Sequence, residues 1–116
     1  MRKAILSIVV QKEIPLTALT SSTADKFLPD WDKFFFVLDM SENQIANEKT
    51  IQFLSAEFRS AEKCFSELYN ELVFFFNKEE MTEFVKIVAA KKILEEYDMV
   101  IITNSDILYN ESFKSI

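Results

Sequence analysis

The side chains that could do chemistry in this sequence are almost all carboxylates. The candidate groups are Asp30 and Asp32, with Asp25 and Asp39 nearby, and Asp98 with Asp106 around the last strongly apolar segment. Carboxylates in such groups can bind Mg²⁺ or Ca²⁺, or act as an acid and base pair. One alternative is therefore a divalent-metal hydrolase built on Asp30, Asp32 and either Asp39 or Asp98. We instead expect a solvated loop or interaction surface without metal, because the spacing and central glycine of a calcium loop are missing.

The residue types that most enzymes depend on are missing. The chain has no histidine, no glycine and one cysteine. Histidine is the usual general base near neutral pH and the commonest metal ligand, and glycine lets a backbone close around phosphate. These absences exclude nucleophile–histidine pairs, the glycine-rich phosphate loops and a structural zinc site. We expect no catalytic residues, no cofactor and no enzymatic activity.

Cys64 is the only thiol, so no disulfide can form within the chain. Secreted chains of this length often carry a disulfide framework, and this one is predicted to be cytoplasmic. The apolar run after Met1 is too short for a signal peptide, and no run approaches the roughly 20 residues that span a bilayer. We interpret Cys64 as a small helical residue rather than a nucleophile.

The charge balance points to the kind of partner. The chain carries 13 basic and 19 acidic residues, a net charge of −6. An acidic surface disfavours nucleic acid and anionic membranes, since both need basic contacts. It suits a basic protein partner, because opposite fields speed encounter and suppress wrong pairings. The alternative is that the charge serves solubility alone.

Short β-branched and aromatic runs predict the strands. Three of them are strongly apolar and a fourth is weaker: residues 4–10, 34–38 and 99–103, then 107–109. Residues 11–33 are mixed in character. Within them Ser22 could begin a short helix that Pro29 ends.

Two capping patterns and one apolar stripe predict the helices. Ser41 with Gln44, and Asn77 with Glu80, have the spacing of a capping box. Between them apolar residues recur at steps of three and four, which predicts one long amphipathic helix: Ile51, Leu54, Phe58, Ala61, Phe65, Leu68, Leu72 and Phe76. A second helix should follow Asn77 and end near Tyr97, with these residues on one side: Met81, Phe84, Val85, Val88 and Leu94.

These elements predict one globular domain over residues 1–116. The expected fold is α/β (α+β), a small three- to four-stranded sheet with the long helix and a second helix packed on one face.

The segment Asp30-Trp31-Asp32 is the most distinctive local feature, because it holds the only tryptophan. One interpretation is an anchor where a strand begins, with the ring inward and the acids outward. The other is an interface hot spot whose carboxylates engage arginine or lysine. On the predicted long helix, Phe53 and Phe74 would lie opposite the stripe and be available to a partner.

We predict an acidic, protein-binding inhibitor of the immunity type that neutralises a basic toxin, a nuclease being the expected case, by occluding its active or substrate-binding surface. The predicted contact residues are Asp25, Asp30, Trp31, Asp32, Asp39, Glu42, Phe53, Glu67, Glu71 and Phe74. One alternative is a homo-oligomeric scaffold or adaptor held by the long helix. Another is a nucleic-acid mimic that blocks a phage-defence protein. Spaced helical acids would then take the place of phosphates: Glu67, Glu71, Glu79, Glu80 and Glu83.

Overall fold

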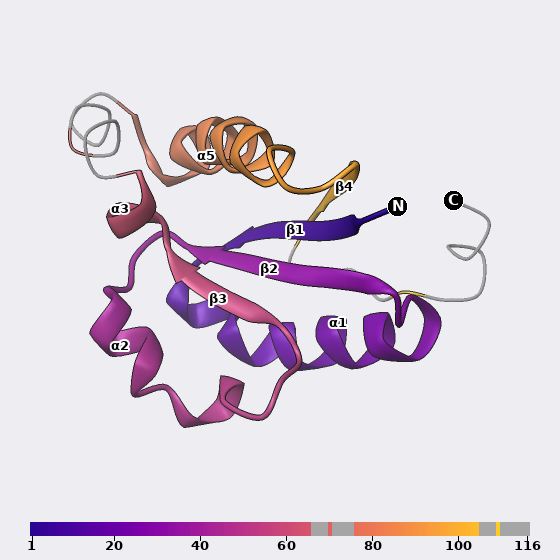
Figure 1. The fold of residues 1–116 in the computed structure, drawn as a ribbon. Helices are drawn as coiled ribbons and strands as arrows, with labels where there is room; N and C mark the ends of the chain where they lie inside the picture. The colour runs from indigo at the N-terminus through magenta and orange to yellow at the C-terminus, as the bar shows by residue number, and fades with distance from the viewer. Residues whose placement is uncertain (66–69, 71–75, 105–108, 110–116) are drawn as a thin grey trace.

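The protein contains a four-stranded, entirely parallel β-sheet, seen in a computed structural model that describes residues 1–65, 70, 76–104 and 109 (Figure 1). Its strands lie in the order β3-β2-β1-β4. Their bounds are Lys3–Val9 for β1, Trp31–Val37 for β2, Glu57–Ser60 for β3 and Met99–Thr103 for β4. The α/β class and the three strongly apolar predicted strands are confirmed. The predicted fourth strand at 107–109 lies largely outside the described residues.

The two central strands are mostly apolar because both of their faces are buried over most of their length. From Ala4 to Val9 every residue of β1 is buried, and so is every residue of β2 from Lys33 to Val37. The register places Leu6 beside Phe34 and Ile8 beside Phe36. Continuous apolar runs of this kind are typical of parallel sheets covered on both sides.

The helices begin where local chemistry satisfies their first amide groups. A 3₁₀ turn, η1 (Gln11–Glu13), leads into α1 (Ile14–Phe27), with Pro15 in the first turn where no amide hydrogen is needed. Both predicted capping boxes are confirmed: Ser41 begins α2 (Glu42–Ala46), and Asn77 begins α5 (Lys78–Ile93). The short helix expected to begin at Ser22 is wrong. Ser22 lies inside α1, whose start is set by the proline.

The helices cover both faces of the sheet rather than the one face expected (Figure 1). Helix α5 packs on the face that carries Leu6 and Phe36, through Val85, Ala89 and Ile93. On the opposite face α1 covers part of the sheet around Ile5 and Trp31, and α2 contributes Ile45 to a cluster with Phe35 and Val37. The second predicted helix is thus found, although it ends at Ile93 and Leu94 is half exposed rather than buried.

The long helix predicted from residue 51 is wrong in its described part. That stretch forms a 3₁₀ turn, η2 (Lys49–Ile51), then strand β3, then a short helix, α3 (Ala61–Cys64). Its apolar residues are packed in two different places: Ile51, Leu54 and Phe58 on the α1 side of the sheet, and Ala61 and Phe65 on the α5 side. Leu68 and Leu72 lie outside the described residues.

The strand order creates a topological switch point. From β1 the chain moves outward through β2 to β3, and then returns through α5 to place β4 on the other side of β1. The connections on the two sides of β1 therefore leave in opposite directions, which opens a crevice at the carboxyl ends of β1 and β4. Among the described residues, no helix is both long and apolar enough to cross a bilayer.

Candidate functional site

A groove lies at this switch point. Its floor comes from Ile8, near the end of β1, and its sides from the start of α1, the first half of α5 and the residue after β4. The lining residues are Ile8, Glu13, Leu16, Glu79, Thr82, Glu83, Lys86 and Asn104. Doubly wound sheets bind their ligands at this position, because loops diverge there and helix amino termini point into the crevice. We call these eight residues the switch-point groove.

Carboxylates of the chain itself cap the 3₁₀ turn before α1 and the start of α5. Glu13 accepts a hydrogen bond from the backbone N–H of Val10 at 2.9 Å, and Glu80 accepts one from that of Asn77 at 3.1 Å. An external phosphate would have to compete with these groups, and no glycine allows the backbone to approach it closely. The groove is therefore poorly suited to nucleotides.

The charge of the groove favours a cation instead. Among the described lining residues three carry carboxylates, Glu13, Glu79 and Glu83, and one carries an ammonium group, Lys86, which pairs with Glu83 at 3.1 Å. An excess of negative charge in a concave, partly desolvated site attracts ammonium or guanidinium groups. Within the described part of the chain, no group of three or more acidic or cysteine side chains is arranged to hold a metal ion. The groove can thus recognise a basic side chain, and Leu16 offers an apolar contact for the aliphatic part of that side chain.

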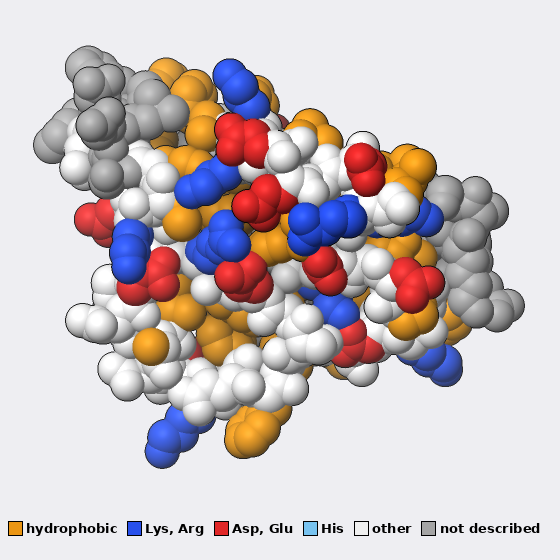
Figure 2. Space-filling model, in the orientation of Figure 1, with side chains coloured by type: hydrophobic (Ala, Val, Ile, Leu, Met, Phe, Trp, Pro, Cys, Tyr) orange, Lys and Arg blue, Asp and Glu red, His pale blue; other side chains and the backbone are white. Residues whose placement is uncertain are grey.

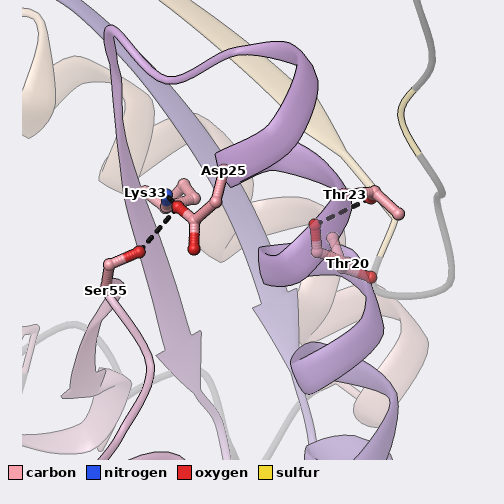
Figure 3. A network of polar contacts seen from close by, with 5 residues as sticks. All are labelled: Thr20, Thr23, Asp25, Lys33 and Ser55. Carbon is pink, nitrogen blue, oxygen red and sulfur yellow. Dashed lines mark hydrogen bonds and ion pairs between the residues drawn. The ribbon is translucent and has the colours of Figure 1, made fainter.

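A second polar cluster surrounds Lys33 at the amino end of β2 (Figure 3). The Lys33 side chain is only 6% exposed and forms an ion pair with Asp25 of α1. Asp25 also accepts a hydrogen bond from the Ser55 hydroxyl at 2.6 Å. Burial lowers the pKa of the Lys33 ammonium. The cluster joins α1, β2 and the loop before β3, so its evident role is to fix these three segments.

On the other side of β2, Asp32 is also engaged within the protein. Its carboxylate accepts a hydrogen bond from the Tyr97 hydroxyl. Burial, followed by the bond to Asp32 and its charge, raises the pKa of Tyr97. Arg2 stacks over the Tyr97 ring at 4.4 Å, and the backbone N–H of Arg2 donates to Asp98 at 2.8 Å. Asp32 and Asp98 therefore stabilise the sheet end, and no described contact gathers them into a metal site.

The structure separates the other predicted contact residues. Trp31 is buried on the α1 side, as in the inward interpretation, so its ring is not presented to a partner. Asp39 accepts a hydrogen bond from the N–H of Gln11 at 2.7 Å, and Glu42 accepts one from that of Ser60 at 2.9 Å. Asp30 is exposed.

Phe53 is 92% exposed, although it lies in a turn after η2 and not on a long helix. The predicted contacts Glu67, Glu71 and Phe74 lie outside the described residues, as does Asp106.

The residues that sequence reasoning missed are those that the topology brings together. Glu13 was not singled out, and Glu79 and Glu83 were noted only as spaced helical acids. The one signal in the sequence for this site was the position of Glu13, an acidic residue shortly after a buried strand and just before a helix with proline in its first turn. Placing it opposite α5 required the strand order, because β1 and α5 are far apart in the sequence.

No protein-family model, curated protein or solved structure matches the chain. Its function is therefore inferred from its own residues. One face of the molecule carries acidic and basic side chains interspersed rather than a continuous acidic surface (Figure 2). Local grooves, and not the net charge alone, must then decide where a charged partner binds.

Proposed function

We propose that this protein is an immunity-type inhibitor that binds a basic protein, a nuclease toxin being the expected case, and occludes its functional surface. The observation that carries the proposal is the acidic switch-point groove. It occupies the place where doubly wound sheets bind ligands, yet its lining favours a basic side chain over a phosphate. The net charge of −6 supports the same class of partner.

The mechanism is occlusion without a chemical step. Proteins that bind nucleic acid carry clustered arginine and lysine side chains. A guanidinium group in the groove would be held by Glu79 and Glu13, while its aliphatic stem packs against Leu16. With those basic side chains covered, the toxin could no longer contact phosphates. The lone thiol supports a reducing compartment, and we propose the cytoplasm.

An oligo-arginine peptide is the direct probe of the groove. Glu79 is exposed and lines the groove, so Glu79→Lys should weaken binding of the peptide about three- to tenfold in calorimetric titration at low salt. Binding to wild type should also weaken as salt rises, because the Debye length falls from about 30 Å at 0.01 M to about 8 Å at 0.15 M.

Glu95→Lys is the matched control, because Glu95 is also exposed but follows the opposite end of α5. It makes the same change in net charge without touching the groove. The proposal requires a clearly smaller effect from Glu95→Lys. Equal losses from the two variants would show that only net charge attracts the peptide, and no detectable binding to wild type at low salt would overturn the groove as a site for basic side chains.

A further inference from the structure

The outer face of α5 and the residue after it carry two exposed apolar side chains. Helix α5 packs Val85, Ala89 and Ile93 against the sheet, and Met81 is also buried. On the opposite side Ile87 is 69% exposed, and Leu94, directly after the helix, is 51% exposed. Figure 1 shows α5 on one side of the sheet, with α1 and α2 on the other. Two exposed aliphatic residues seven positions apart lie on one helical stripe, as in a helix that packs against another.

The charges along this stripe are arranged symmetrically about Ile87. Glu83 lies four residues before it and Lys91 four residues after it, and both are exposed. More broadly, the first turn of α5 is acidic, with Glu79 and Glu80, and the last turn is basic, with Lys91 and Lys92. Residues four apart share a helical face, so Glu83, Ile87 and Lys91 form one continuous surface.

We propose that this stripe binds a second copy of the same chain, with the two α5 helices antiparallel and a two-fold axis passing beside Ile87. A two-fold interface must be self-complementary, because the same patch faces itself. In this arrangement Ile87 meets its own counterpart, while Leu94 lies outside this central contact, level with Glu80 of the partner subunit. Glu83 faces Lys91 of the partner subunit, and the symmetry repeats that pair on the other side. A parallel arrangement in register would instead place each charge against its own kind.

The pairing is expected to be weak. A single pair of helices buries less than the roughly 1,200 Å² of a standard stable interface. A dissociation constant of about 10–100 µM is the corresponding range for a transient dimer. The stripe shares one residue, Glu83, with the switch-point groove, where its carboxylate pairs with Lys86 at 3.1 Å. The other groove residues are not needed for the pairing.

Sedimentation equilibrium over a concentration range that spans this dissociation constant tests the proposal. Wild type should pass from monomer to dimer mass as concentration rises. Glu83→Lys places lysine opposite lysine, and Lys91→Glu places glutamate opposite glutamate, so each should weaken association about tenfold. The double swap Glu83→Lys with Lys91→Glu restores opposite charges and should recover most of the lost association. Ile87→Asp should abolish it.

Two control variants make the same charge changes elsewhere: Lys49→Glu on η2 and Glu62→Lys on α3, both exposed. They should leave the dimer unchanged, and circular dichroism should show that all variants fold. A wild type that stays monomeric at the highest concentration would overturn the proposal. Association that survives Ile87→Asp would place the interface elsewhere, and a double swap no stronger than the single variants would exclude the antiparallel pairing.

Discussion

Replacing Phe36 by alanine should lower the free energy of unfolding by about 3–5 kcal/mol, the usual cost of removing a buried phenyl ring. Phe36 is 0% exposed, lies on the central strand β2 and packs under α5, with its ring 5.5 Å from that of Phe65. Domains of this size are typically stable by about 5–15 kcal/mol in total, so this one change threatens the whole fold. Urea denaturation followed by circular dichroism measures the loss, and Phe36→Leu, which keeps most of the volume, should cost clearly less.

Phe53→Ala is the matched control, since it removes the same ring from a position that is 92% exposed. It should change the free energy of unfolding by no more than about 0.5 kcal/mol, as surface substitutions usually do. A loss as large as that of Phe36→Ala would show that Phe53 is buried in solution and that the turn after η2 is folded differently.

The strands could be predicted because their composition follows directly from their burial. Strands β1 and β2 are central and almost fully buried, and the edge strand β4 is partly buried. Their runs of β-branched and aromatic residues have no other common explanation in such short segments. The capping boxes at Ser41 and Asn77 could be predicted for a similar reason. Each is a local hydrogen-bond pattern that needs no tertiary partner.

The helix predicted from Ile51 failed because burial, and not helical periodicity, spaced its apolar residues. The chain crosses from the α1 side of the sheet to the α5 side along this segment. Phe58 stacks on Phe35 with ring centroids 4.8 Å apart, while Phe65 reaches Phe36 on the other face. Apolar residues at steps of three and four can thus serve two separate clusters, and periodicity alone cannot separate that case from one helix.

The acidic residues illustrate the same limit for the candidate site. Counting carboxylates gives the net charge correctly, but it does not reveal which of them are engaged within the protein. Asp25 forms an ion pair with Lys33 and accepts a hydrogen bond from another segment of the chain. Asp39 and Glu42 each accept a hydrogen bond from a backbone N–H of another segment. The groove acids come from segments far apart in the sequence, so their proximity depends on the strand order.

Asp25→Ala should cost more stability than Lys33→Met, even though both remove one member of the same ion pair. Lys33 is 6% exposed, so losing Asp25 leaves a buried ammonium without its counter-charge. We expect a loss of about 1–3 kcal/mol, below the value for a fully buried pair because the Asp25 side chain is 48% exposed. Methionine is close to lysine in length and carries no charge, so Lys33→Met should stay within about 1 kcal/mol of wild type.

The pH dependence of the free energy of unfolding, compared between wild type and Lys33→Met, distinguishes an ionised Lys33 from one that contributes only by packing. Burial lowers the pKa of Lys33 below the ordinary 10.5, so between those two values the unfolded chain binds more protons at this residue than the folded one. Wild type should therefore gain stability relative to Lys33→Met as pH rises through that window toward 10.5. Urea denaturation of both proteins at neutral pH and at about pH 10 measures this difference in stability. Tyrosine ionisation changes the stability of both proteins alike, so it cancels in the comparison. A stability difference that stays constant with pH, together with an Asp25→Ala variant as stable as Lys33→Met, would mean that Lys33 is hydrated and that the ion pair does not fix α1 to β2.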